Sequence, residues 1–254
     1  MTHALDPGGD VHLWTAAVSE LEDPEHYASS WSVLSTSEQR HAGRFRFEQD
    51  RNSFLASRAL RRHVLSCYAA VEPKQWQFAD SEYGRPRIAF PVLDEMLEFN
   101  CSKSADLVIC AVTRGISVGV DIERLDRKVP GPVAESTFAA IELAAIEALP
   151  RHDQGKRFFA YWTLKEAYLK ARGLGLSVPL DSMAFTVTDS PGLVGHMEFS
   201  AANDCSEWQF TLLSPSPLHI AAVCVRRQYD LEAHVEIHRY SQQLNLLKAR
   251  APSW

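Results

Sequence analysis

The spacing of apolar residues along this chain switches between a helical and an extended pattern. Residues 50–69 place apolar side chains, including Phe54, Leu60 and Val64, on or near one face of a long helix. Before this helix, Ser35-Thr-Ser-Glu38 has the form of a capping box and predicts the start of a shorter helix. The compact apolar runs that predict strands lie at residues 97–100, 107–112, 116–123, 183–188, 208–213 and 218–225.

Proline and glycine divide the later part of the chain. Pro130-Gly-Pro132 precedes a helix that we predict for residues 133–149. After a second break, another helix carries Glu166 and ends near Gly173. We predict that the tail, residues 231–254, is a helix packed on the body of the protein.

A faint internal repeat links the two long helices. Phe54-Leu-Ala-Ser-Arg-Ala-Leu60 is echoed by Phe158-Phe-Ala-Tyr-Trp-Thr-Leu164. Each helix is followed further along by an apolar strand, at residues 107–112 and 220–225. The pattern suggests a duplicated unit that combines a long helix with strands.

The composition narrows the class of protein. Lys and Arg number 26 against 32 Asp and Glu, a net charge of −6, which argues against a general binder of nucleic acids. No apolar stretch approaches the roughly 20 residues needed to span a bilayer, and residues 1–10 lack a secretory pattern. The odd, scattered cysteines predict reduced thiols in a cytoplasmic protein. They are Cys67, Cys101, Cys110, Cys205 and Cys224.

Several common site patterns are missing from the sequence. There is no phosphate-binding glycine loop, no dinucleotide-binding fingerprint and no Gly-x-Ser-x-Gly segment. The histidines, including His12, His41, His63 and His219, show no metal-ligand or triad spacing.

Two acidic segments about forty residues apart carry the strongest chemical signal. In Val118-Gly-Val-Asp-Ile-Glu123, a predicted strand, Asp121 and Glu123 share one face. In the predicted helix, Glu166 and Lys170 are four residues apart and lie one above the other. Three carboxylates and an ammonium brought together would hold a divalent cation and a phosphate. Alternatively, the strand carboxylates face solvent and the helix residues form an ordinary surface pair.

These segments resemble those of the 4'-phosphopantetheinyl transferases, especially the long, monomeric, pseudo-dimeric class that acts on carrier proteins. Three further segments, which follow the family's order, add to the resemblance. They are Glu82-Tyr-Gly-Arg-Pro86, Phe99-Asn-Cys-Ser-Lys-Ser104 and Gly173-Leu-Gly-Leu-Ser177. The resemblance implies an α+β fold of two pseudo-symmetric halves, each a small, mostly antiparallel sheet packed with a long helix. The active site would lie in the cleft between them, and we place the boundary near residue 115.

The resemblance also implies roles for individual residues. Residues 116–254 would supply Asp121, Glu123 and Glu166 to hold Mg²⁺. Glu142 would act as the general base, and its alternative role is that of a solvated helix residue. Lys170 would neutralise the developing charge or protonate the leaving group, and Lys165 would either touch phosphate or lie exposed.

Residues 1–115 would contact the phosphates of coenzyme A. The candidates are Arg51, Arg58, Arg85, Ser102 and Lys103, with Lys165 and Lys170 from the other half. Arg51 and Arg58 come from a stretch crowded with arginine, which could instead form a solvated helix face or attract an acidic partner. Lys103 stands where relatives usually have histidine, and it keeps a positive charge at physiological pH.

We therefore expect transfer of the 4'-phosphopantetheine arm from coenzyme A to a serine of an apo acyl or peptidyl carrier protein, with Mg²⁺, by a cytoplasmic monomer. Nucleic acid and membrane are not expected partners. One alternative is a non-catalytic relative that binds coenzyme A or a carrier protein. Another is an unrelated Mg²⁺-dependent nucleotide phosphohydrolase.

Overall fold

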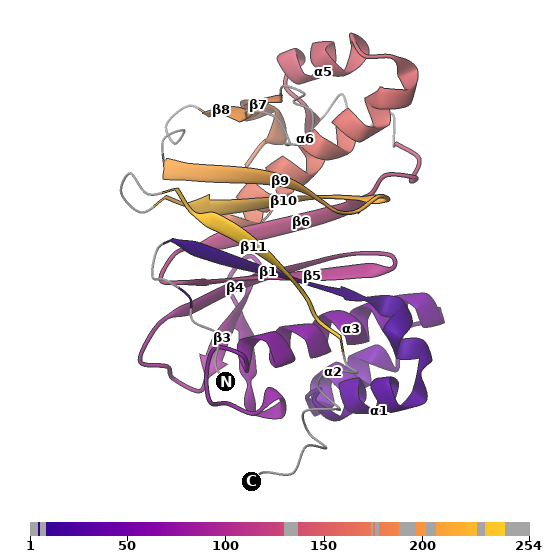
Figure 1. Ribbon diagram of the computed structural model, residues 1–254, viewed down its shortest axis with the longest axis vertical. Helices are drawn as coiled ribbons and strands as arrows, with labels where there is room; N and C mark the ends of the chain where they lie inside the picture. Colours follow the sequence, from indigo (N-terminus) through magenta and orange to yellow (C-terminus); the bar gives the residue numbers. More distant parts are fainter. Residues whose placement is uncertain are drawn as a thin grey trace.

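The fold repeats one series of elements twice along the chain (Figure 1). The computed structural model describes residues 5, 9–129, 137–173, 175, 178–187, 197–201, 207–227 and 232–241. Each series begins with a strand, continues through helices that include one long helix, and ends with two hairpins.

The first series consists of β1 (Asp10–Ala17), η1 (Val18–Glu22), α1 (Pro24–Ser32), α2 (Thr36–Ala42), α3 (Glu48–Leu65), η2 (Pro73–Gln75), β2 (Gln77–Asp80), β3 (Pro86–Phe90), β4 (Leu97–Ser104) and β5 (Leu107–Arg114). The second consists of β6 (Val118–Arg124), α5 (Ala140–Glu147), α6 (Arg151–Arg172), η4 (Leu180–Ser182), β7 (Met183–Val187), β8 (Met197–Ala201), β9 (Trp208–Ser216) and β10 (His219–Arg226). The last described strand, β11 (His234–Arg239), follows the second series.

The two main sheets have matching strand orders. In the first, β5 lies between β1 and β4, and in the second, β10 lies between β6 and β9. All of these pairs are antiparallel. In both series the last strand therefore returns to pair with the first, which confirms an α+β fold of two pseudo-symmetric halves. The first series ends at Arg114 and the second begins at Val118.

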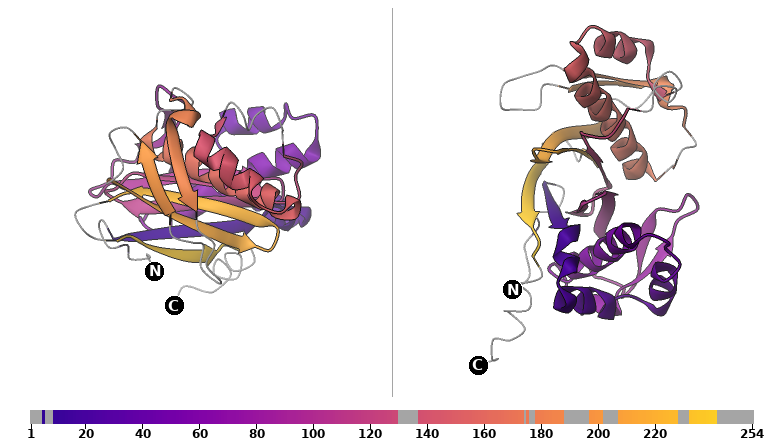
Figure 2. Two further views of the ribbon diagram at one scale, coloured as in Figure 1. Left: turned by 90° about the horizontal axis from the view of Figure 1, so that it is seen from above. Right: turned by 90° about the vertical axis from the view of Figure 1, so that its right-hand side faces the viewer.

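Each half buries its long helix against its own sheet. Leu60 and Val64 of α3 share an apolar cluster with Val108 of β5, and Leu164 of α6 shares another with Ile220 of β10. The long helices of both halves lie on the same side of the strands (Figure 2, right). A third apolar cluster joins the two sheets, and it contains Val11, Leu13, Ile109, Val118, Val120, Ile122 and Val223.

β6 has two different faces because side chains alternate along a strand. Val118, Val120 and Ile122 are at most 1% exposed and point into the apolar seam between the sheets. The alternate positions, Gly119, Asp121 and Glu123, therefore share the face against which α6 packs. The seam fixes the strand, and α6 covers its polar side.

Gly119 allows α6 to approach β6 closely. A Cβ atom at this position would lie 2.0 Å from the carbonyl oxygen of Ala167 and 2.3 Å from the amide nitrogen of Ala171. Both atoms belong to the backbone of α6, so they cannot move aside as the end of a flexible side chain could. Glycine is required here for space, and its side chain of a single hydrogen brings the two elements together.

Most of the predicted elements are present. The capping box at Ser35 and Glu38 opens α2, and the helix predicted for residues 50–69 is α3, Glu48–Leu65. Gly173, with φ of 66°, ends α6 in the left-handed conformation that glycine adopts easily. For the helix predicted at residues 133–149, α5 covers Ala140–Glu147, and residues 130–136 lie outside the described residues.

The helix predicted for the tail is wrong within the described residues. Residues His234–Arg239 form the strand β11, which pairs parallel with β1. The reason is tertiary: the edge of β1 offers backbone hydrogen-bonding groups that a strand can satisfy. Residues 242–254, which complete that predicted helix, lie outside the described residues. Among the described helices, none combines the length and the apolar character needed to cross a membrane.

Candidate functional site

The two acidic segments meet where β6 packs on α6, and β4 of the first half completes the group. Lys170 Nζ lies 2.6 Å from Asp121 Oδ1 and donates to Ser102 Oγ at 3.1 Å. Ser102 Oγ in turn donates to the same Asp121 oxygen at 2.8 Å. The three side chains come from β6, α6 and β4, so this group sits at the junction of the two halves.

Asp121 has one oxygen that no side chain satisfies. The residue is only 6% exposed, and its Oδ2 atom is buried without a hydrogen-bond partner among the residues that the structure describes. A buried carboxylate oxygen left unpaired is costly, because burial removes the water that would otherwise hydrate it. Such an oxygen is suited to a ligand that the protein itself does not supply.

Two further carboxylates lie within electrostatic range of Asp121. Partial burial raises the pKa of Glu166, and the charges of Asp121 and Glu123 raise it further, against the effect of Lys170. Burial also raises the pKa of Glu123, with a contribution from Asp121, while Arg127 pairs with Glu123 and opposes the rise. The oxygens of these carboxylates are not all within 4.8 Å of one another. Their mutual repulsion is the kind that a cation between them relieves.

The residues present fit a hard divalent cation. Asp121, Glu123 and Glu166 offer only oxygen donors, and Mg²⁺ prefers one or two carboxylates together with water and substrate phosphates. The unpaired Oδ2 of Asp121 points to such a ligand independently of the charge count. These three carboxylates are therefore the residues that would hold Mg²⁺.

Basic side chains border the group on the side of β4 and α3. Burial lowers the pKa of Lys103, and the nearby charge of Arg58 lowers it further, against Asp50. The thiol of Cys101, next to Ser102, has its pKa lowered first by a hydrogen bond with Cys110 and then by the charges of Arg61, Arg58 and Lys170. The charges of Arg58, Arg61 and Lys170 therefore act on this part of β4.

Arg51 and Arg58 have different surroundings on α3. Arg51 pairs with Glu48 at 3.2 Å. Arg58 lies 3.9 Å from Glu38 and stacks its guanidinium over the ring of Phe54. Both side chains keep about a third of their surface exposed. They can therefore reach a bound anion without leaving a buried partner.

The neighbouring arginines Arg61 and Arg62 are buried in structural contacts. Glu38, the capping residue of α2, accepts from Arg61 at 2.8 Å and from Arg62 at 2.6 Å. Arg62 also donates to the carbonyl oxygen of Trp76 at 2.6 Å. Both residues are at most 3% exposed, so they do not belong to a solvated helix face, which was one alternative for this arginine-rich stretch.

Arg85 joins the two halves at the end of α6. Its guanidinium donates to the carbonyl oxygens of Ala171 at 2.7 Å and Val118 at 3.1 Å, and to Glu98 at 3.0 Å. The Ala171 oxygen belongs to the last turn of α6, where carbonyls lack helical partners. Both terminal nitrogens of Arg85 are thus used within the protein, in a role that differs from the expected contact with coenzyme A.

Glu142 and Lys165 form a buried ion pair. Their charged atoms are 2.7 Å apart, and both side chains have 0% exposure. Glu142 also accepts from the backbone amides of Ala139 and Phe185. Lys165 donates to the carbonyl oxygens of Leu180 and Met183, each at 2.7 Å. This placement differs from the expected roles of Glu142 as general base and Lys165 as a phosphate contact, because burial closes both to substrate.

We expect the variant Glu142→Gln to lose stability more than activity. The glutamine side chain would keep the shape but leave the Lys165 ammonium without its counter-charge, a loss of about 3–5 kcal/mol in the free energy of unfolding. Denaturant unfolding and turnover at low temperature measure the two effects separately. Glu147→Gln, an exposed position on the same helix, is the matched control and should change neither. A hundredfold loss of turnover with unchanged unfolding would restore the catalytic role of Glu142.

Asn100 is a residue of this site that the sequence did not single out. Its side chain is 4% exposed, and its Oδ1 accepts from the backbone amide of Val120 at 3.1 Å. The contact fixes β4 beside β6, one residue before Asp121. Asn100 lies in the same segment as Ser102 and Lys103, and the resemblance of that segment to the family is the signal that could have found it.

Comparisons with known proteins cover both halves. A family model described as the 4'-phosphopantetheinyl transferase superfamily matches residues 117–224. A second, described as 4'-phosphopantetheinyl transferase, N-terminal, matches residues 22–114. The two matches meet at the turn between β5 and β6.

Individual relatives agree with the family models. The 4'-phosphopantetheinyl transferase HetI of Nostoc sp. is 33% identical over 218 residues, covering 85% of this chain and 87% of that protein. The 4'-phosphopantetheinyl transferase Sfp of Bacillus subtilis is 31% identical over 153 residues, covering 60% of this chain and 66% of that protein. A solved structure described as the ACPS–CoA complex of Chronobacterium ammoniagenes covers 45% of this chain and 98% of its own, at 20% identity and a TM-score of 0.31.

Proposed function

This chain belongs to the 4'-phosphopantetheinyl transferase superfamily, and we propose that it transfers the 4'-phosphopantetheine arm of coenzyme A to a serine hydroxyl of an apo carrier protein, with Mg²⁺, releasing 3',5'-ADP. The observation that carries this proposal is the junction at Asp121. There a carboxylate with an unpaired buried oxygen meets Lys170 and Ser102, with two more carboxylates beside it.

Each residue at the junction has a chemical role in this proposal. Asp121, Glu123 and Glu166 would hold Mg²⁺, which supplies Lewis-acid stabilisation and a template for the pyrophosphate when bound. Lys170 is held by Asp121 and Ser102, and its ammonium would stabilise the negative charge that the pyrophosphate gains. The exposed part of Arg51, Arg58 and Lys103 contacts the nucleotide phosphates.

The transfer forms one bond and breaks one. The serine oxygen attacks the β-phosphorus, a new phosphoester bond forms, and the bond to the bridging oxygen of the pyrophosphate breaks. The leaving group is 3',5'-ADP. Lys170 either neutralises the negative charge on its leaving oxygen or donates a proton to that oxygen. The serine proton passes to a carboxylate of the site or to water, because Glu142 is enclosed by Lys165 and two backbone amides.

The two halves of the repeat have different roles in this proposal. Residues 1–115 provide coenzyme A contacts on α3 and β4, and residues 116–254 provide the metal-binding carboxylates and the activation of the serine. We propose an acyl or peptidyl carrier protein as the partner and a monomer as the active form, since both halves of the site are in one chain. A cytoplasmic location accords with the reduced state of the described cysteines Cys67, Cys101, Cys110 and Cys224, none of which forms a disulfide with another described cysteine.

Lys103 is expected to contribute charge to coenzyme A binding. Lys103→Ala should weaken the affinity for coenzyme A about tenfold, the effect of losing roughly 1.4 kcal/mol at a partly exposed phosphate contact. Lys103→His keeps a cationic donor in part of the population and should stay within about threefold of the wild type. Calorimetric titration with coenzyme A measures both variants. Equal affinity for the wild type and the alanine variant would remove Lys103 from the nucleotide site.

The products of the reaction test the proposal against its alternatives. The protein, coenzyme A and Mg²⁺ are incubated with and without an apo carrier protein, and nucleotide products are separated by chromatography. We expect 3',5'-ADP only when the carrier is present. Nucleotide or phosphate release without the carrier would indicate a phosphohydrolase. Binding of coenzyme A without product in either mixture would indicate a non-catalytic relative.

A further inference from the structure

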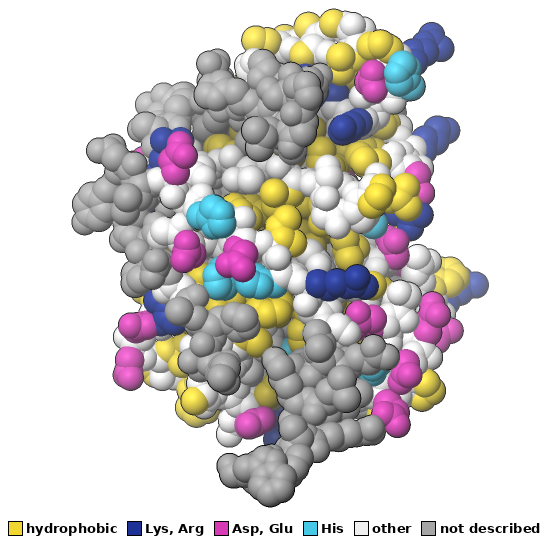
Figure 3. All heavy atoms as spheres, in the orientation of Figure 1, with side chains coloured by type: hydrophobic (Ala, Val, Ile, Leu, Met, Phe, Trp, Pro, Cys, Tyr) yellow, Lys and Arg dark blue, Asp and Glu magenta, His cyan; other side chains and the backbone are white. Residues whose placement is uncertain are grey.

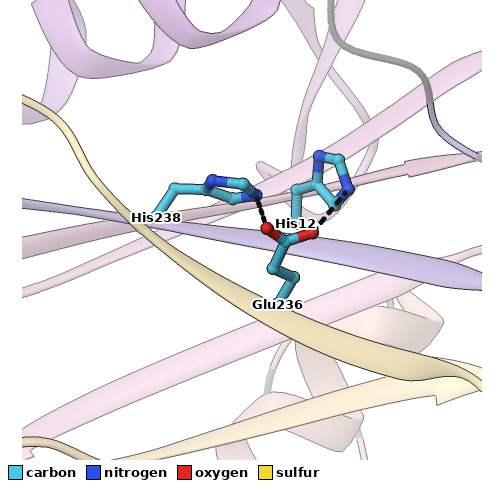
Figure 4. A group of neighbouring side chains, drawn as sticks. All are labelled: His12, Glu236 and His238. Carbon is cyan, nitrogen blue, oxygen red and sulfur yellow. Dashed lines mark ion pairs between the residues drawn. The ribbon is translucent and has the colours of Figure 1, made fainter.

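A second group of possible ligand side chains lies where β1 pairs with β11. This pair forms the edge of the first sheet opposite to β4. His12, Glu236 and His238 each offer one ligand atom, and these atoms all lie within 4.8 Å of one another. Figure 4 shows the three side chains converging, His12 from β1 and the other two from β11. β4 carries Ser102, so the group is separate from the carboxylates around Asp121.

The register of the two strands creates this group. β1 and β11 are parallel, with His12 opposite Glu236 and Trp14 opposite His238. Because side chains alternate along each strand, Glu236 and His238, two residues apart, share the face of the sheet that carries His12 and Trp14. A shift of one residue would send the β11 side chains to the other face. The convergence therefore depends on the observed pairing.

The distances match those of a small metal site. His12 Nε2 lies 3.6 Å from Glu236 Oε2, and His238 Nε2 lies 3.5 Å from Glu236 Oε1. In a tetrahedral zinc site with bonds of about 2.0–2.1 Å, neighbouring ligand atoms are about 3.4 Å apart. Two of the three pairs of ligand atoms are therefore already near this separation, and all three pairs lie within 4.8 Å.

The two imidazoles are held by neighbours that leave their Nε2 atoms directed at Glu236. His12 is 6% exposed and makes a hydrogen bond of 2.8 Å through Nδ1 to the hydroxyl of Tyr68, which also accepts from Trp14 Nε1 at 2.7 Å. The ring of His238 stacks on Trp14, with centroids 4.6 Å apart and planes at 20°. A histidine ligand that hydrogen-bonds through its other nitrogen is the usual support of a metal site.

The carboxylate leaves the group open to solvent. Glu236 is 55% exposed, whereas the two histidines are largely covered. Histidine and acidic side chains gather on this face over β1 and β11 (Figure 3). Two imidazoles and one carboxylate, with a position left for water, form a donor set suited to Zn²⁺ and related transition metals and less suited to Mg²⁺.

We propose that His12, Glu236 and His238 bind one Zn²⁺-like transition-metal ion and that this ion fastens the C-terminal strand β11 to β1. The ligands come from two strands whose positions in the sequence are more than 200 residues apart. Binding an ion that requires both strands must stabilise their pairing, because it favours only the paired state.

Calorimetric titration of the full chain with Zn²⁺ tests the site. Excess Mg²⁺ is included in the buffer to compete for the carboxylates around Asp121, the proposed Mg²⁺ site. We expect one ion per chain, with affinity at least tenfold weaker in Glu236→Gln and in His238→Ala. His234→Ala, an exposed histidine on the same face of β11 but outside the group, is the matched control and should bind as the wild type does. Titration with Co²⁺ should give the visible absorption of a tetrahedral ion in the wild type and in His234→Ala, and not in Glu236→Gln or His238→Ala.

Hydrogen exchange tests the structural consequence. Zn²⁺ should slow exchange of the backbone amides of residues 234–239 in the wild type and leave it unchanged in Glu236→Gln, whose exposed position preserves folding. Equal Zn²⁺ affinity in the wild type and Glu236→Gln would overturn the site. Zn²⁺ binding abolished by Asp121→Asn with Glu166→Gln, and kept in Glu236→Gln, would assign the ion to the other group and overturn the proposal as well.

Discussion

Replacing Glu166 by glutamine is expected to lower turnover roughly a thousandfold while the affinity for coenzyme A stays within about threefold. Glu166 is one of three carboxylates around the unpaired oxygen of Asp121. Electrostatic stabilisation of a transferring phosphoryl group by a held cation is worth several kcal/mol, and a loss of about 4 kcal/mol corresponds to a thousandfold in rate. The nucleotide contacts on α3 and β4 are untouched, so binding should survive.

Single-turnover transfer and calorimetric binding of coenzyme A measure the two effects of Glu166→Gln. Glutamine preserves the size of the side chain, and half-buried Glu166 makes no buried ion pair with another described residue, unlike Glu142 with Lys165. Glu147→Gln serves again as an exposed control. Near-normal turnover in Glu166→Gln would exclude Glu166 from the metal-binding group, and an equal loss of binding and turnover would place it in nucleotide recognition.

The second large effect is expected from Gly119→Ala. The added methyl group would lie 2.0 Å from the Ala167 oxygen and 2.3 Å from the Ala171 nitrogen, so α6 or β6 must move. Overpacking of this kind costs about 3 kcal/mol or more. Any such movement separates Lys170 from Asp121, now 2.6 Å apart. We therefore expect both the free energy of unfolding and the transfer rate to fall.

Denaturant unfolding and transfer assays at low temperature measure the two losses in Gly119→Ala. Gly155→Ala, on α6 itself, is the matched control: its Cβ would meet nothing closer than 3.8 Å, and alanine should stabilise the helix by about 0.5–1 kcal/mol. Wild-type stability and transfer in Gly119→Ala would show that the contact between β6 and α6 is looser than observed.

The sequence predicts the junction at Asp121 because local patterns decide it. Alternation along residues 116–123 places Asp121 and Glu123 on one face, and helical spacing stacks Glu166 on Lys170. These rules hold without knowledge of the rest of the chain. The same is true of the capping box at Ser35 and of the turn at Gly173, each of which depends on a few neighbouring residues.

The sequence does not predict which charged side chains are buried. The sequence gives no sign of which arginine is buried among Arg58, Arg61 and Arg62. Of the three, only Arg58 keeps about a third of its side chain exposed, because the other two form buried ion pairs with Glu38 of α2. Lys165 and Lys170 share one helix, yet Lys165 is enclosed by Glu142 and two carbonyl oxygens. Which side of a helix meets which neighbour is set by tertiary packing.

The sequence also does not predict the pairing of strands that lie far apart in the chain. The sequence does not predict β1 and predicts a helix at β11, because β11 is stabilised by pairing with β1, and β1 by pairing with β11 and β5. His12 and His238 show no ligand spacing in the sequence, since only the parallel pairing of β1 with β11 brings them to Glu236. A site built across distant strands gives no local signal.

Intact-mass analysis of an apo carrier protein, after incubation with this protein, coenzyme A and Mg²⁺, is the decisive test of the proposed transfer. Each carrier is expected to gain one phosphopantetheine arm. No gain is expected when EDTA removes the metal or when the carrier's acceptor serine is replaced by alanine. If apo carriers of both the acyl and the peptidyl type stay unmodified while the protein still binds coenzyme A, the proposed transferase activity is contradicted.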